Sequence, residues 1–167
     1  DVQLVVNLTP NRLHAQVGLQ IIEAGKHLYG EKPLAVYREE AQRLLSEDEA
    51  LAFWLAGEKE TYLFALTRDR FRWQAIPLGQ SKLSDMIARL RGGLDVEKLS
   101  SSIDAGEPVL FDLSLAHELY ASLLGPVEDL IKSKRRLLVV PTGALTAIPF
   151  HLLVTEKPAV AVPAKQL

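Results

Sequence analysis

The chain has 167 residues, a length that suits one ordinary domain with a buried core. Its 19 basic and 21 acidic residues leave a formal net charge of −2, so charge gives no reason to expect nucleic acid or an anionic membrane as a partner. Cysteine is absent, which excludes disulfides, thiolate metal ligands and a cysteine nucleophile among these residues.

Neither a membrane span nor a leader is indicated. No apolar run approaches the roughly 20 residues that cross a bilayer. The first ten residues, DVQLVVNLTP, lack the basic flank and the length of a signal peptide. Together with the absence of cysteine, these features are compatible with a cytoplasmic protein, and that is the location we predict.

Residues 1–35 are predicted to form a helical extension or linker. Residues 2–6 are a short apolar run that suits a strand. Residues 11–28 carry an imperfect helical stripe, which Gly18 interrupts and which Gly25 or Gly30 should end. Proline suits a first helical turn, so Pro33 is expected to open a second helix over residues 33–45.

The pattern then changes from a helical to a strand period. Three short runs rich in aromatic and aliphatic residues lie at residues 50–55, 61–67 and 71–78. The breaks between them are polar and only a few residues long. Loops this short join antiparallel neighbours, so we predict a three-stranded meander.

Helices and one more strand are expected in the rest of the chain. A clear apolar stripe, at helical spacing, consists of Leu83, Met86, Ile87, Leu90 and Leu94. Residues 100–108, SSSIDAGEP, are expected to form a loop, and a helix should run from Ser114 to Gly125. The basic run at residues 132–136 is expected to complement a helix terminus. Residues 136–141 then suit a strand covered on both faces.

The residue types that perform catalysis show no recognisable arrangement. His14, His27, His117 and His151 have no metal spacing, and each is expected to be a surface or locally hydrogen-bonded residue. His151 is a functional candidate because it directly follows Pro149 and Phe150, but its apolar neighbours suit a strand or short helix better than a catalytic loop. Neither G-x-S-x-G nor a phosphate loop is present. We therefore assign no catalytic, cofactor-binding or metal-binding residue.

One block of sequence resembles a known family. Residues 119–153, LYASLLGPVEDLIKSKRRLLVVPTGALTAIPFHLL, resemble the signature of the CHAT domain, a caspase-like domain attached to tetratricopeptide repeats in many bacteria. Residues upstream resemble the opening meander of that family, so the similarity spans residues 38–153. The positions that match the motif are Leu123, Leu124, Pro126, Pro141, Gly143, Leu145, Pro149, Phe150 and Leu153.

The resemblance implies an α/β fold, α+β within these residues, in which an antiparallel meander and helices lead into the first strand of a caspase-like sheet. Residues 36–167 would be the N-terminal half of a CHAT-like domain, with both chain ends as cut points. The motif residues would have structural roles. The histidine and cysteine of the family's catalytic dyad come after the matched segment, so the chain is expected to be an inactive fragment of a cysteine endopeptidase that needs no cofactor.

Two other functions remain open from the sequence. One is a CHAT-like scaffold that binds a partner protein without catalysis, and the other is an unrelated α/β binding module. The expected partners are the rest of the CHAT domain, tetratricopeptide repeats or a protein substrate. An incomplete domain should also expose apolar surface, so we predict self-association through a sheet edge near residues 137–140.

Overall fold

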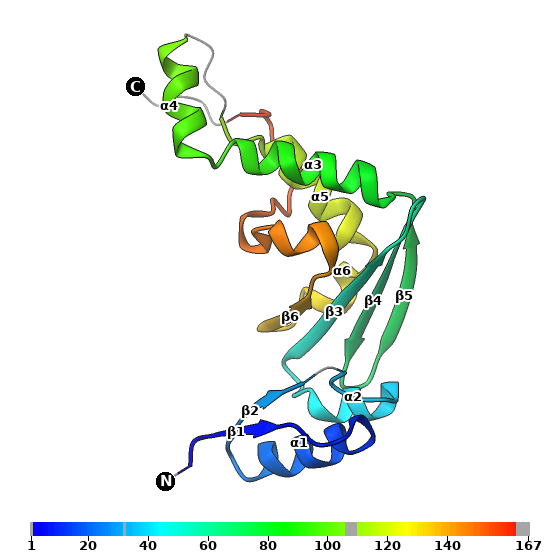
Figure 1. Cartoon of the computed structure of the whole chain (residues 1–167). Helices are drawn as coiled ribbons and strands as arrows, with labels where there is room; N and C mark the ends of the chain where they lie inside the picture. Colours follow the sequence, from blue (N-terminus) through cyan, green and yellow to red (C-terminus); the bar gives the residue numbers. More distant parts are fainter. Residues whose placement is uncertain (1, 32, 106–109, 163–167) are drawn as a thin grey trace. The chain divides into compact units, whose positions relative to one another are not determined.

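A computed structural model describes residues 2–31, 33–105 and 110–162. The protein is a mixed α/β structure, as predicted, with one two-stranded sheet in the order β1-β2 and one four-stranded sheet in the order β5-β4-β3-β6 (Figure 1). The chain divides into two compact units. The first consists of Asp1–Leu51, Ala65–Phe71 and Asp129–Leu138, and the second of Ala52–Phe64, Arg72–Glu128 and Val139–Leu167. The predicted division at residue 35 stays a prediction.

The first unit begins with a strand–helix–strand segment. Strand β1 (Leu4–Asn7) pairs in parallel with β2 (His27–Gly30), and the register places Leu4 opposite His27 and Asn7 opposite Gly30. The short 3-10 helix η1 (Asn11–Leu13) and helix α1 (His14–Glu23) connect them. Parallel neighbours need such a crossover, because the chain must return to the starting edge of the sheet.

Glycine ends α1, as the sequence predicts. Gly25 has a φ of +68°, a left-handed conformation that glycine adopts without a steric penalty. The backbone N–H of Gly25 donates to Ile22 O at 2.9 Å and that of Lys26 donates to Ile21 O at 3.1 Å, which is the Schellman pattern. The helix therefore ends before Lys26. Of the two glycines predicted to end the helix, Gly25 does so, and His27 and Leu28, which the helical stripe included, belong to β2.

The buried face of α1 differs from the stripe predicted for this segment. The buried residues of the helix are His14, Ala15, Gly18 and Ile21. A side chain added at Gly18 would lie 3.1 Å from Leu28 Cδ2 and 3.5 Å from Leu44 Cδ2. At Gly18 the inward face therefore has a glycine, because the helix backbone approaches Leu28 and Leu44 closely there.

Helix α2 (Arg38–Leu44) contacts the turn between the second and third strands of the other sheet. The Gln42 side-chain amide donates to Thr67 O at 3.0 Å and to Arg70 O at 3.1 Å. In return, Arg68 Nη1 donates to Leu45 O at 3.0 Å. These bonds bring side-chain donors to carbonyl groups of a turn and of the residue that ends α2.

The predicted meander is present in the four-stranded sheet. Its strands are β3 (Glu49–Ala56), β4 (Thr61–Thr67) and β5 (Phe71–Ile76), and consecutive strands are neighbours. Turn hydrogen bonds close both hairpins, with Gly57 N donating to Glu60 O and Thr67 N donating to Arg70 O, each at 2.8 Å.

Strand β6 (Arg136–Val140) lies beside β3 at the edge of this sheet. Its exposed apolar residues are Leu137 at 36%, Leu138 at 42% and Val140 at 48%. The expectation of a strand covered on both faces is therefore wrong, whereas the expected exposure of apolar residues 137–140 is confirmed. Self-association through this edge stays a prediction.

The second unit has its core around Trp54 of β3. The Trp54 side chain is fully buried, its Nε1 donates to Leu123 O at 3.1 Å, and its ring stacks on Phe150 with centroids 5.3 Å apart. Helices α3 (Gln80–Gly92) and α5 (Leu113–Leu123) bury apolar stripes of Leu83, Met86, Ile87 and Leu90 and of Leu115, Ala116, Leu119 and Leu123. Apart from Leu94, which is 42% exposed beyond the end of α3, the predicted stripe of α3 is confirmed.

Helix α4 (Val96–Asp104) occupies part of the segment expected to be a loop. Asp95 caps it, since its Oδ1 accepts from Glu97 N and Lys98 N, each at 3.1 Å. The loop prediction is therefore wrong for Ser100–Asp104, and residues 106–108 lie outside the described part of the chain. The serines remain compatible with a helix because their hydroxyls donate to carbonyls one turn earlier.

Short helical turns complete the second half of the chain. After α5 come η2 (Gly125–Val127) and α6 (Glu128–Ile131), and the basic run follows α6 rather than occupying its last turn. The 3-10 helices η3 (Gly143–Ala147) and η4 (Phe150–Leu152) follow β6. Among the described residues, no helix combines the length and apolarity that crossing a bilayer requires.

A substitution at Gly79 tests how closely the backbone packs in the second unit. A Cβ atom at Gly79 would lie 2.1 Å from the backbone oxygen of Glu58, whereas one at Gly92 would meet nothing within 4 Å. Gly79→Ala should therefore lower stability by about 2 kcal/mol or more, because backbone must move to make room. Gly92→Ala, the matched control, should raise it by about 0.5–1 kcal/mol. Thermal unfolding of both variants checks this, and equal melting temperatures would contradict the close approach at Gly79.

Candidate functional site

The carboxyl ends of β1 and β2 form one edge of the first unit. Because the strands are parallel and Asn7 lies opposite Gly30, the segments that leave them begin side by side. In α/β sheets, ligands bind outside this edge. The residues that follow the strands here are Leu8 and Thr9 on one side and Glu31 on the other.

Asn7, the last residue of β1, organises the loop that follows it. Its side chain is 4% exposed. Its Oδ1 accepts from Thr9 Oγ1 at 2.7 Å and from Thr9 N at 3.3 Å, while its Nδ2 donates to His14 O at 3.0 Å. The amide thus supplies both an acceptor and a donor, and it joins the strand end, the loop and the start of α1.

The His14 ring lies between the two loops at this edge. It is 4% exposed, and Nε2 lies 2.6 Å from Thr9 O while Nδ1 lies 2.6 Å from Pro33 O. Thr9 follows β1, and Pro33 follows β2. One side chain therefore contacts the backbone of both segments that leave the parallel strands.

The outer surface of this edge is apolar with polar backbone. Leu8 is 70% exposed and Tyr29 is 65% exposed. Leu8 directly follows β1 and Tyr29 is the second-last residue of β2, so both exposed side chains lie near the ends of the parallel strands. No three His, Asp or Glu side chains gather for metal binding anywhere in the part of the chain that the structure describes.

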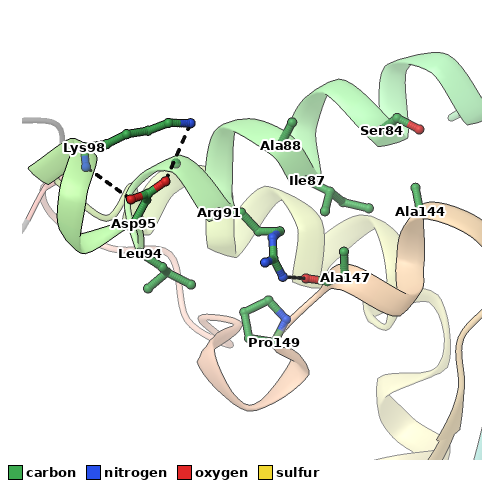
Figure 2. Close-up of a pocket in the computed structure, with 11 residues that line it drawn as sticks. Ser84, Ile87, Ala88, Arg91, Leu94, Asp95, Lys98, Ala144, Ala147 and Pro149 are labelled. Carbon is green, nitrogen blue, oxygen red and sulfur yellow. Dashed lines mark hydrogen bonds and ion pairs between the residues drawn. The ribbon is translucent and has the colours of Figure 1, made fainter.

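The second unit has a cavity of about 550 Å³ beside α3 and η3 (Figure 2). Arg91 Nη1 donates to Ala147 O at 2.9 Å, which ties η3 to α3. Lys98 Nζ lies 3.8 Å from Asp95 Oδ2, and that Asp95 carboxylate also caps α4. The charged side chains of Arg91, Asp95 and Lys98 thus have structural partners. The side chains drawn in Figure 2 do not converge on one point as a catalytic set would.

The motif residues identified from the sequence lie around the core of the second unit. Leu123, Leu124 and Leu145 are buried, and Phe150 stacks on Trp54. Gly143 has a φ of +53° at the start of η3, the conformation for which glycine was expected there. Pro126 lies in η2, Pro141 directly follows β6, Pro149 borders the cavity, and Leu153 follows η4. Their assignment as a structural motif stays a prediction.

The four histidines lie apart, as their sequence spacing suggests. His27 and His151 are exposed, and Nδ1 of His117 lies 3.0 Å from Val154 O. His14 is the residue that sequence reasoning undervalued. It shares a helix face with Gly18 and Ile21 at spacings of four and seven residues, a signal that a histidine and a glycine in the stripe conceal.

Comparison with known proteins gives matches of limited extent. Residues 1–51 match a family described as an oxidoreductase family with an NAD-binding Rossmann fold. A levoglucosan dehydrogenase from Pseudarthrobacter phenanthrenivorans is 46% identical over 44 residues. The aligned part covers 26% of this chain and 11% of that protein's length. No solved structure matches.

These matches correct the family identification made from the sequence. The CHAT resemblance is wrong, and with it the expectation of a cysteine endopeptidase fragment and of a CHAT-like scaffold, because the matching family and protein are oxidoreductases. The caspase-like arrangement of the sheet is likewise not supported. The motif residues that suggested it are mostly prolines, glycine and leucines, which specify turns and packing in many folds and perform no chemistry.

Asn7→Asp tests the network at the strand ends. The new carboxylate would face the His14 carbonyl oxygen where an N–H now donates, and it would be nearly buried. We expect a loss of about 1–3 kcal/mol of unfolding free energy, since a buried acceptor loses its donor. Asn11→Asp, the same change at an exposed residue of η1, should have little effect. Urea unfolding distinguishes the two variants, and similar midpoints would count against the network.

Proposed function

We propose that the β1–α1–β2 segment is part of an NAD-binding Rossmann domain and that the protein functions as an oxidoreductase. The observation that carries the proposal is the match of residues 1–51 to an NAD-binding oxidoreductase family. The parallel pairing of β1 and β2 across α1 supports it, since the Rossmann fold is built from such units. The described residues supply two strands of that fold.

The strand-end edge fits one part of the cofactor. Leu8 and Tyr29 offer exposed apolar surface, and the loop backbone beside them offers polar groups. The G-x-G-x-x-G fingerprint that cradles a pyrophosphate is absent from the sequence. We therefore assign to this segment one wall of a dinucleotide site, not its phosphate cradle.

The role of these residues would be to bind and orient. A nicotinamide cofactor exchanges a hydride with an alcohol or carbonyl substrate when both are bound. The buried Asn7 network fixes the loop of Leu8 and Thr9, so that its exposed surface is held in one place. A loop that is already ordered binds the cofactor without the entropic cost of ordering that loop on binding.

Titration of the 15N-labelled, 167-residue chain with NADH tests the proposal. Amide shifts should change in a saturable way at Leu8, Thr9, Gly30 and Glu31, and little in α3 or α5. No change at millimolar NADH, or changes confined to the second unit, would contradict it.

A matched pair of variants sharpens this test. Leu8→Asp places a negative charge beside the site of an anionic cofactor and should weaken NADH binding by roughly tenfold, about 1.4 kcal/mol. Leu55→Asp makes the same change on β3, at a side chain that is 52% exposed, and should leave NADH affinity unaltered. Equal NADH affinities of the two variants would contradict the assignment of Leu8 to the site.

A further inference from the structure

We propose that His14 is a positioning residue of this site, a clamp that holds the loop after β1 and the loop after β2 at a fixed separation. The inference rests on the proposed function for its consequence in cofactor binding. Its structural part, the linking of two loops by one ring, follows from the contacts of His14 alone.

The clamp consists of two short contacts made by one buried ring. Nε2 lies 2.6 Å from Thr9 O, and Nδ1 lies 2.6 Å from Pro33 O. The ring is rigid, so the two carbonyls cannot move apart without breaking a contact. Because Thr9 and Pro33 follow adjacent parallel strands, their separation sets the width of the edge on which a ligand would bind.

The position of the His14 residue itself is also fixed. His14 is the first residue of α1, and its own carbonyl accepts from Asn7 Nδ2 at 3.0 Å. Its side chain is 4% exposed, so water does not compete freely for the ring nitrogens. The ring is therefore held from the strand end and from the helix, and it transmits that position to both loops.

The chemistry of the ring makes histidine suited to this place. Each carbonyl needs a donor, and an imidazole that carries protons on both nitrogens supplies two donors in opposite directions. With one proton, the ring donates to one carbonyl and presents a lone pair to the other. A carbonyl oxygen only accepts, so a hydrogen bond to Thr9 O or to Pro33 O requires a proton on the ring nitrogen that faces it.

A spectrum of the ring tests the clamp without any ligand. In a long-range 15N–1H experiment on the labelled chain, we expect an N–H proton of the His14 ring that is protected from exchange by its carbonyl partner and by burial. Ring protons of His14 that exchange as fast as those of the exposed His151 would overturn the proposal.

Variants test the consequence for the loops and for the cofactor. His14→Phe keeps a flat ring and removes both ring nitrogens, so hydrogen exchange at Thr9 and Glu31 should accelerate and NADH affinity should fall by roughly tenfold. His14→Gln retains an N–H donor on a longer chain and should recover part of both effects. The same change at an exposed ring, His151→Phe, should alter neither.

The outcomes separate the clamp from the proposed function. If the unaltered chain does not bind NADH, the proposed function fails, while exchange at the two loops still tests the clamp. If NADH binds but His14→Phe leaves exchange and affinity unchanged, the clamp fails alone. Should His14→Phe not fold, His14→Gln and the ring spectrum decide, and equal loop exchange in His14→Gln and the unaltered chain would overturn the proposal.

Discussion

The close approach of α1 to β2 determines how the first unit is built. A Cβ atom at Gly18 would lie 3.1 Å from Leu28 Cδ2, so a larger residue there would require the packing of helix and strand to shift. His14 and Ile21 are buried on the same face of α1 as Gly18. The ring of His14, at the start of this helix, contacts Thr9 O and Pro33 O.

The strand ends illustrate how a parallel pair satisfies its backbone. The ladder stops at Asn7 and Gly30, and carbonyls beyond it need other donors. Here the His14 ring contacts Thr9 O and Pro33 O, whereas the hairpins of the four-stranded sheet close with backbone bonds, as between Gly57 and Glu60. Asn7 and His14 thus lie at the edge where α/β sheets bind ligands.

Periodicity predicted the elements that bury a regular stripe and failed where tertiary contacts decide. The meander follows from three strand-length runs joined by short polar loops, and α3 follows from its apolar stripe at helical spacing. Strand β2 was missed, since four residues, His27–Gly30, show no alternation and exist as a strand only through pairing with β1. Helix α4 was missed because serines favour loops unless a cap such as Asp95 starts a helix before them.

The sequence did not predict the candidate site, because sequence motifs identify residues that react with a substrate or bind a metal. The residues at the strand ends instead contact backbone atoms of the neighbouring loops. In an NAD-dependent reaction the hydride passes between cofactor and substrate. The protein therefore has to bind and orient both molecules, and it does not need a nucleophilic side chain for that step. Because the cofactor would carry the hydride, redox chemistry is compatible with a chain that has no cysteine and, in its described residues, no metal cluster. Under the proposed function, the chain would have to hold the loops at the ends of β1 and β2 in place. Asn7 and His14, both buried, contact main-chain atoms of His14, Thr9 and Pro33 at these loops.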